Sequence, residues 1–221
     1  MQGAAMSFRK INNAGRCINI GKYPSDKMHM NIWSESILER DLIYRLEYDS
    51  NVISYRVQAV RIFFELDGKR RHYTPDFLCE RRTGRPQIIE VKPKNKLSAW
   101  FLQLYGIITP ICEREGFEFV VFTEFEIRIQ PFLDNIKLLW KYARVPLYPA
   151  HQVLCYEFFS LRQEAPLGEL SEFFVRRGVQ TQVVLALLYH GIISTDLSIP
   201  LGADSPVTYQ SGSTTTNKEA A

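Results

Sequence analysis

The chain has 221 residues, of which 46% are hydrophobic and 13% aromatic, enough to bury the core of one large domain or two small ones. Its four cysteines lie far apart without a C-x-x-C pair, so the pattern indicates neither a zinc site nor a disulfide framework. No apolar run has the length of a signal peptide or a membrane span, so we expect a cytoplasmic protein with no membrane partner.

The formal net charge of +3 is distributed unevenly along the chain. From Tyr148 to the end there are four Lys or Arg residues against seven Asp or Glu residues, so the positive excess lies in the first two thirds. Because a polyanion binds where Lys and Arg neutralise its phosphates, we expect nucleic acid to meet the N-terminal part. The acidic C-terminal part is more typical of a surface that binds another protein.

The first predicted segment, residues 1–30, is polar and rich in Gly and Asn with scattered Lys and Arg, which indicates a basic N-terminal arm. A helix is expected from residue 34 to a cluster of turn-forming residues at 48–51. The apolar residues of this segment recur at the spacing of one helix face: Leu38, Leu42, Ile43 and Leu46.

Three short strands are predicted after the helix, at residues 60–66, 73–79 and 87–91. Asp67-Gly68 and Thr83-Gly84 are turn signals between them, so we expect an antiparallel meander.

Further on, a helix is predicted at 97–115, a strand at 117–123 and a helix at 132–142. The strand is apolar enough to be central in its sheet. The order of elements predicts an α/β fold for residues 31–146, with one mixed sheet flanked by helices.

A second, smaller domain is predicted after a Pro-containing linker at 145–149. Three short helices, at 151–161, 167–175 and 180–190, are followed by an apolar segment that begins a hairpin or wing. This order favours a winged-helix-like helical domain over residues 147–200. The small, polar residues 201–221 indicate a disordered tail.

The stretch that carries chemistry is YTPDFLCERRTGRPQIIEVKPK, residues 73–94. On a strand the side chains of Glu90 and Lys92 share one face, and the turn at 83–84 brings Asp76 opposite them. Pro75 removes a ladder donor, which favours a strand edge or bulge at that point.

The two carboxylates, together with the backbone carbonyl of Val91, offer hard oxygen ligands for Mg²⁺ or Mn²⁺. Lys92 could then orient or deprotonate an attacking water, or stabilise charge on a phosphate. The alternative is that Asp76, Glu90 and Lys92 form only a weak cross-strand ion pair on a solvated face.

Glu39 is the candidate for a third carboxylate, because it falls within the apolar stripe of the first helix, where an unpaired charge is costly. The alternative is a capping box, in which Ser36 and Glu39 only satisfy each other's backbone amides. Glu35 lies near the same helix face and is the substitute ligand.

Four basic side chains are candidate DNA contacts: Arg70, Arg71, Lys94 and Lys96. A solvated face explains the two arginines equally well. Trp100 and Phe101 are interpreted as core residues rather than base-stacking residues, and His72 as a surface residue outside the site.

The segment YTPDFLCERRTGRPQIIEVKP, with SESILERDLIYRLEYDSNVISYRVQ before it, resembles the TnsA family of transposon endonucleases, a branch of the PD-(D/E)xK nucleases. The resemblance covers residues 34–122. It implies a restriction-endonuclease-like fold in which Glu39, Asp76 and Glu90 bind Mg²⁺, with Mn²⁺ as a substitute, and Lys92 is the catalytic lysine.

TnsA-like nucleases cut the 5′, non-transferred strands of double-stranded DNA at transposon ends, while a DDE transposase, TnsB, cuts and joins the 3′ ends. The resemblance therefore implies a bacterial cytoplasmic protein that works with a TnsB-like transposase and binds a TnsC-like AAA+ regulator through its C-terminal domain. A related branch is CRISPR-associated. Two alternatives stay open: a noncatalytic module that binds DNA ends and recruits a regulator, and a freestanding restriction or repair nuclease.

Overall fold

The computed structural model describes residues 5–8 and 21–210, and the chain divides into two compact units, Met1–Arg128 and Ile129–Ala221. The division lies before the segment at 145–149 that the sequence indicated as the linker. The helix that was expected to close the first domain, α4 (Phe132–Trp140), is therefore part of the second unit.

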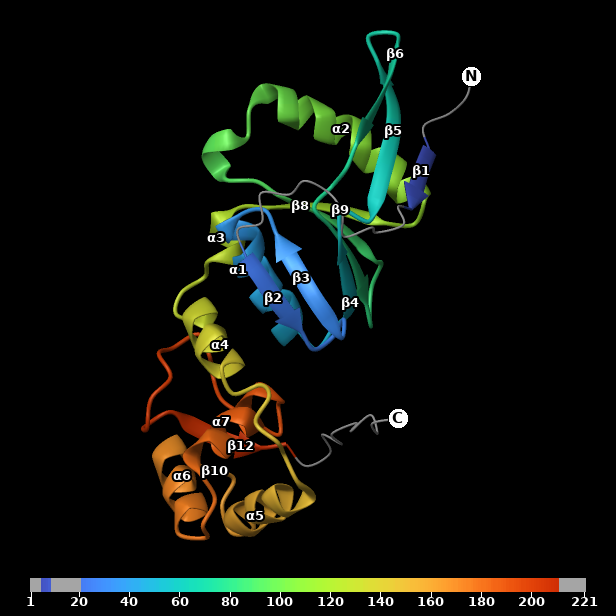
Figure 1. Cartoon of the computed structure of the whole chain (residues 1–221). Helices are drawn as coiled ribbons and strands as arrows, with labels where there is room; N and C mark the ends of the chain where they lie inside the picture. The colour runs from blue at the N-terminus through green and yellow to red at the C-terminus, as the bar shows by residue number, and fades with distance from the viewer. Residues whose placement is uncertain (1–4, 9–20, 211–221) are drawn as a thin grey trace. The chain divides into compact units, whose positions relative to one another are not determined.

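A mixed sheet of four strands lies at the centre of the first unit (Figure 1). Its strands, in spatial order, are β4 (Val52–Val57), β7 (Phe77–Arg81), β8 (Gln87–Val91) and β9 (Glu118–Phe122). The first three are antiparallel neighbours, whereas β8 and β9 run parallel. Ile88 and Ile89, on the two faces of β8, are fully buried. β9 is an edge strand with half-buried residues, so its predicted central position is wrong.

A second antiparallel sheet contains β1 (Ala5–Phe8), β5 (Val60–Leu66) and β6 (Lys69–Tyr73). The predicted turn between β5 and β6 is confirmed: Asp67 and Gly68 have positive φ of 54° and 67°, as the favoured two-residue hairpin turn requires. Strand 60–66 is also confirmed as predicted.

The predicted single meander is wrong, because the chain changes sheets between Tyr73 and Phe77. Pro75 has no N–H to donate to a strand ladder, which explains the interruption at this point. β7 then pairs with β8 and with β4, a strand that the sequence analysis did not predict.

A β-hairpin occupies part of the expected N-terminal arm, formed by β2 (Gly21–Ser25) and β3 (Met30–Ser34). It is attached to α1 (Ile37–Tyr48), because the buried Glu47 carboxylate accepts hydrogen bonds from the Ser25 hydroxyl and, at 2.7 Å, from the Tyr55 hydroxyl. Residues 21–30 are therefore part of the folded unit, and residues 5–8 pair with β5. The rest of the predicted arm, 1–4 and 9–20, lies outside the described residues.

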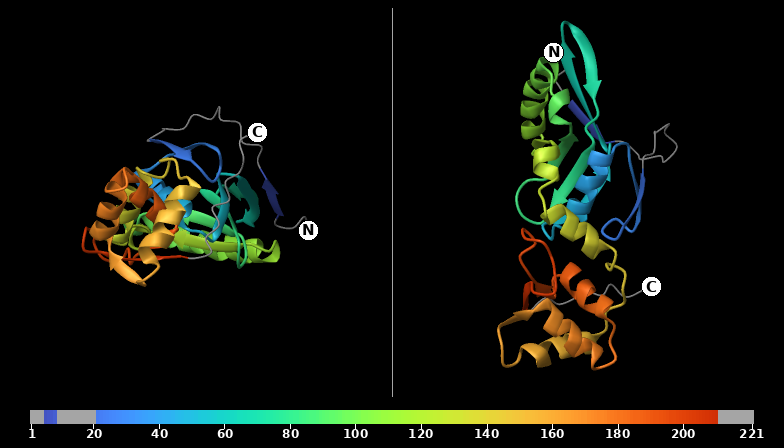
Figure 2. Two further views of the ribbon diagram at one scale, coloured as in Figure 1. Left: turned by 90° about the horizontal axis from the view of Figure 1, so that it is seen from below. Right: turned by 90° about the vertical axis from the view of Figure 1, so that its left-hand side faces the viewer.

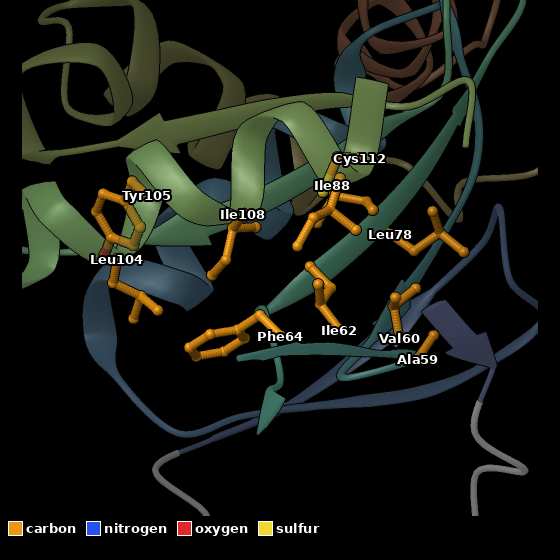
Figure 3. Packing of buried hydrophobic residues seen from close by; sticks show 11 residues of the cluster. Ala59, Val60, Ile62, Phe64, Leu78, Ile88, Leu104, Tyr105, Ile108 and Cys112 are labelled. Carbon is orange, nitrogen blue, oxygen red and sulfur yellow. The ribbon is translucent and has the colours of Figure 1, made fainter. Parts of the chain in front are cut away.

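The core of the first unit lies beneath α2 (Ala99–Arg114), which packs on β5 and β9 and runs beside the β5–β6 hairpin (Figures 1 and 2). Buried side chains of α2 meet those of both sheets in one cluster (Figure 3). The cluster includes Val60, Ile62, Phe64, Leu78, Ile88, Leu104, Tyr105 and Ile108. Burial of this apolar cluster stabilises the packing of α2 on both sheets. The remaining helices of this unit are η1 (Lys94–Lys96) and α3 (Glu124–Ile127).

The second unit combines helices with a small antiparallel sheet in the order β10-β12-β11. Its elements after α4 are α5 (Pro149–Phe159), β10 (Glu164–Pro166), α6 (Leu167–Val175), α7 (Thr181–Tyr189), β11 (Ile193–Ser194) and β12 (Pro206–Tyr209). The three predicted helices are confirmed within two residues at each end. No helix of the described part of the chain has the length and apolar character to cross a membrane.

β12 lies within the predicted disordered tail, where it pairs with β10 and β11. The tail prediction is therefore wrong for residues 201–210, because small polar residues there pair with strands that are distant in sequence. Residues 211–221 lie outside the described part.

Candidate active site

Asp76 lies in the break between β6 and β7 and faces the end of β8. Its Oδ2 atom accepts a hydrogen bond of 2.7 Å from the backbone N–H of Val91. Its backbone carbonyl accepts one of 2.7 Å from the N–H of Gln58. The β7–β8 register, with Phe77 opposite Ile89, sets this position. Asp76 thus lies beside the end of the strand that carries Glu90 and Lys92, as strand alternation predicted.

Glu90 lies near the end of β8, and Lys92 follows directly after the last residue of this strand. Glu90 is only 2% exposed, and its Oε1 atom lies 3.3 Å from Lys92 Nζ. The same ammonium lies over the ring of Phe101, 4.4 Å from the ring centroid. Lys92 is therefore held between a buried carboxylate and an aromatic face, rather than on a solvated surface.

The second carboxylate oxygen of Glu90, Oε2, is buried and makes no hydrogen bond of ordinary geometry among the described residues, although the nearby Tyr73 hydroxyl lowers the pKa of this carboxyl. A buried charged oxygen without a partner is costly, and such an atom is a candidate ligand for a bound cation.

Glu39 lies in the first turn of α1 and is 8% exposed. Half of the capping box forms, because the Ser36 hydroxyl accepts a hydrogen bond of 3.0 Å from the Glu39 N–H. The Glu39 carboxylate, however, accepts its bond of 2.9 Å from the N–H of Glu35. Its electrostatic coupling to Asp76 and Lys92 places it in the same neighbourhood.

Gln58 is a part of this site that the sequence analysis missed. It lies between β4 and β5 with a positive φ of 48°. Besides its backbone bond to Asp76, its side-chain amide donates a hydrogen bond of 2.9 Å to the Glu35 carboxylate. Because the N–H of Glu35 in turn binds the Glu39 carboxylate, contacts run continuously from Asp76 to Glu39. A glutamine between two strands has no sequence feature that predicts hydrogen bonds to Asp76 and Glu35.

Electrostatic repulsion and burial both favour the neutral forms of these acids. Burial, together with the charges of Glu90 and Glu39, raises the pKa of Asp76 to about 8. Burial also raises the pKa of Glu90, against the opposing effect of Tyr73 and Lys92. The pKa of Glu39 is likewise raised by burial. A divalent cation would relieve the repulsion between these carboxylates.

The residues present fit a hard cation such as Mg²⁺, because two carboxylates meet where β7 begins and β8 ends, and the Oε2 atom of Glu90 is buried without a hydrogen bond of ordinary geometry. Within residues 5–8 and 21–210, no group of three or more His, Cys, Asp or Glu side chains forms a ready-made metal site. The fit therefore depends on Asp76 and Glu90, with Glu39 near them.

The predicted DNA contacts are exposed. Arg70 lies on β6 with its guanidinium over the Phe63 ring, and Arg71 follows it. Lys94 and Lys96 are exposed in η1, where the backbone N–H of Lys94 donates a 2.8 Å hydrogen bond to the half-buried Glu124. Exposure is compatible with phosphate binding, and the roles of these residues stay predictions.

The interpretation of Trp100 as a core residue is wrong, since half of its surface, 50%, is exposed. It lies in the first turn of α2, where its neighbour Phe101 is half-buried.

This geometry defines a class: an α/β protein with a nuclease-like fold, in which two acids and a lysine lie together at the ends of the two inner strands of a mixed sheet. Residues 49–124 match the family model described as TnsA-like endonuclease N terminal. The resemblance to the TnsA family is thereby confirmed, and the chain contains a TnsA-like endonuclease domain that supports a nuclease role in transposition. No curated protein matches the chain. The matched range includes Gln58, Asp76, Glu90 and Lys92 and begins after Glu39.

Proposed function

We propose that this chain is a Mg²⁺-dependent DNA endonuclease that cuts the 5′, non-transferred strands at transposon ends. The observation that carries the proposal is the cluster of Asp76, Glu90 and Lys92 within the TnsA-like domain, with the Asp76 carboxylate bonded to β8. The proposal includes a heteromeric cut-and-paste transposase, in which a TnsB-like DDE transposase cuts the 3′ strands.

Asp76, Glu90 and the Val91 carbonyl would hold the cation, with Glu39 as a further carboxylate. When bound there, Mg²⁺, or Mn²⁺ in its place, lowers the pKa of a coordinated water and neutralises phosphate charge. The Val91 N–H orients the Asp76 carboxylate, and the burial of Glu90 limits competition from bulk water.

Lys92 supplies a positive charge next to these carboxylates. Its position between Glu90 and the Phe101 ring restricts the motion of a flexible side chain. In the proposed reaction the ammonium binds a phosphate oxygen or the attacking water and stabilises the negative charge that develops during hydrolysis.

The second unit is proposed to be a winged-helix-like domain that binds a TnsC-like AAA+ regulator. The element order α5-β10-α6-α7-β11-β12 supports this, because three helices with a terminal antiparallel pair are the arrangement expected of such a module. The charge of this part supports a protein partner over DNA, because its acidic residues outnumber its basic residues. Exposed carboxylates lie on or near its helices at Glu157, Glu164 and Glu172.

Separate measurements of DNA binding and DNA cleavage distinguish a nuclease from a noncatalytic DNA-binding module. Asp76→Ala should abolish cleavage of transposon-end DNA while binding of the DNA and of the ATPase persists. Asp204→Ala, at an exposed turn of the second unit, is the control and should leave both unchanged. Cutting that survives in Asp76→Ala at the wild-type rate would contradict the proposed function.

A further inference from the structure

We propose that Trp100 is a DNA contact whose indole stacks on a base next to the scissile phosphate, at a place where the DNA is locally unstacked. This inference depends on the proposed nuclease function and adds to it a contact that recognises an aromatic base rather than a phosphate.

The indole of Trp100 is both exposed and held in place. Half of its surface, 50%, is accessible, although a tryptophan gains more from burial than most side chains. Its ring packs edge-on against Phe101, with centroids 4.9 Å apart and an interplanar angle of 75°. Because one edge is fixed in this way, the remaining surface is available to a flat partner at a small entropic cost.

The same Phe101 ring connects this surface to the proposed catalytic lysine. Lys92 Nζ lies 4.4 Å from the Phe101 centroid, so Trp100 and Lys92 contact one ring between them. The indole of Trp100 is therefore separated from the lysine by a single aromatic side chain, and a base stacked on the indole would lie one ring further away. A nucleotide held there would lie close in the DNA to the one that is cut.

The charge around Trp100 favours nucleic acid over a protein surface. Lys94 and Lys96 are exposed in the helical turn just before α2, and the first turn of α2 contains no acidic residue. The Glu124 carboxylate accepts a hydrogen bond from the backbone N–H of Lys94, so one negative charge lies near that residue. Lys96 is the lysine closer in sequence to Trp100. Lysines beside an exposed aromatic ring are the combination by which proteins bind unpaired nucleotides.

The apolar surface nearby gives the competing explanation. Leu102, two residues along α2, is 59% exposed, and a protein partner could cover both side chains. An exposed leucine cannot stack on a base as an indole does. Leu102→Ala is therefore the matched control for a general loss of apolar surface on this helix.

The test uses the full-length chain, assembled with its candidate transposase and ATPase on transposon-end DNA, with Ca²⁺ in place of Mg²⁺ to keep the DNA uncut. 2-Aminopurine is placed in turn at each position around the end, because its fluorescence reports the loss of base stacking and its replacement by contact with an indole. We expect one position next to the cut to change. Trp100→Ala should remove this change and weaken DNA binding by about tenfold, the loss of one base–aromatic contact.

Trp100→Phe should keep most of the signal and the affinity, and Leu102→Ala should keep both. Thermal melting of each variant excludes a loss of folding. The inference is overturned if Trp100→Ala leaves the 2-aminopurine signal unchanged, if Leu102→Ala has the same effect, or if Trp100→Ala weakens only the binding of the protein partners. A wild-type chain that makes no cut in Mg²⁺ would instead overturn the proposed function, because the stacking signal is measured without cutting.

Discussion

The Asp76 carboxylate accepts a 2.7 Å hydrogen bond from the backbone N–H of Val91, and this one contact links the break after β6 to the end of β8. It places the Asp76 carboxylate at the backbone of the residue that separates Glu90 from Lys92 in the chain. Burial and the neighbouring carboxylates raise the pKa of Asp76, so its charge is not favoured in the folded chain without metal. A substitution at Asp76 should therefore change chemistry more than stability.

Asp76→Asn is the first prediction. The amide oxygen can still accept the Val91 hydrogen bond, but the charge that binds a cation is lost. Since even residues that only orient metal ligands contribute about 10- to 100-fold, we expect single-turnover cleavage in Mg²⁺ to fall by more than about 100-fold. The melting temperature measured without metal should not fall. A variant that retains most of its cleavage would exclude Asp76 as a metal ligand.

Lys92→Ala tests the proposed role of the ammonium. Removal of a charge that stabilises the transition state should lower the rate of cleavage about 100- to 1,000-fold. Lys96→Ala is the matched control, because Lys96 is an exposed lysine in the short helix that follows Lys92. It should leave the rate at which bound DNA is cleaved unchanged. It should also reduce the slope of log affinity against log salt concentration by about one. If the two substitutions lowered the rate at which bound DNA is cleaved by the same factor, the role assigned to Lys92 would be contradicted.

Gln58 provides a test of the contacts that connect Asp76 to Glu39. Gln58→Ala and Gln58→Gly both remove the side chain that binds Glu35, and each should raise the Mg²⁺ concentration needed for cleavage about 10- to 100-fold. Because Gln58 has φ of 48°, the glycine variant should be the more stable of the two. If Gln58→Gly kept the wild-type Mg²⁺ requirement, the bond from the Gln58 side chain to Glu35 would not contribute to cation binding.

The raised pKa of Asp76, about 8 in the folded chain, predicts a pH dependence of stability without metal. The unfolded chain releases this proton near the ordinary value of 3.8, so between about 4 and about 8 the folded state binds more protons than the unfolded state. The contribution of Asp76 to the free energy of unfolding therefore falls as the pH rises through this window. Asp76→Asn has no such proton, and its stability relative to wild type should rise over the same range. Urea denaturation in EDTA at several pH values measures this difference, and a constant difference would contradict the prediction.

The residues at the site that could be predicted from the sequence are those determined by local geometry. Glu90 and Lys92 follow from strand alternation, and Asp76 lies close to them because a short turn connects β7 and β8. Gln58 could not be predicted, since its role depends on contacts with Glu35 and with the backbone of Asp76 across the fold.

The arrangement of the strands was harder to predict than their existence. Pro75 marks the interruption after β6, but only the pairing with β4 decides that β7 joins a different sheet. The β2–β3 hairpin was missed because its buried apolar residues are few, Tyr23 on one strand and Ile32 on the other, and stand among polar residues. Its attachment depends on Glu47, a charged residue that is buried in contact with Ser25. A polar composition therefore does not indicate an arm when its hydrogen bonds are made within the fold.

A strand-by-strand map of the breaks at both transposon ends would show whether the site around Asp76 cuts the 5′ strands. The full-length chain, its candidate transposase and its candidate ATPase are incubated with a donor plasmid in Mg²⁺, and wild type is compared with Asp76→Ala. We expect the variant to lose the 5′-strand breaks while the 3′-strand breaks remain. Identical breaks on both strands with the two proteins would contradict this expectation, because the site around Asp76 would then cut neither strand.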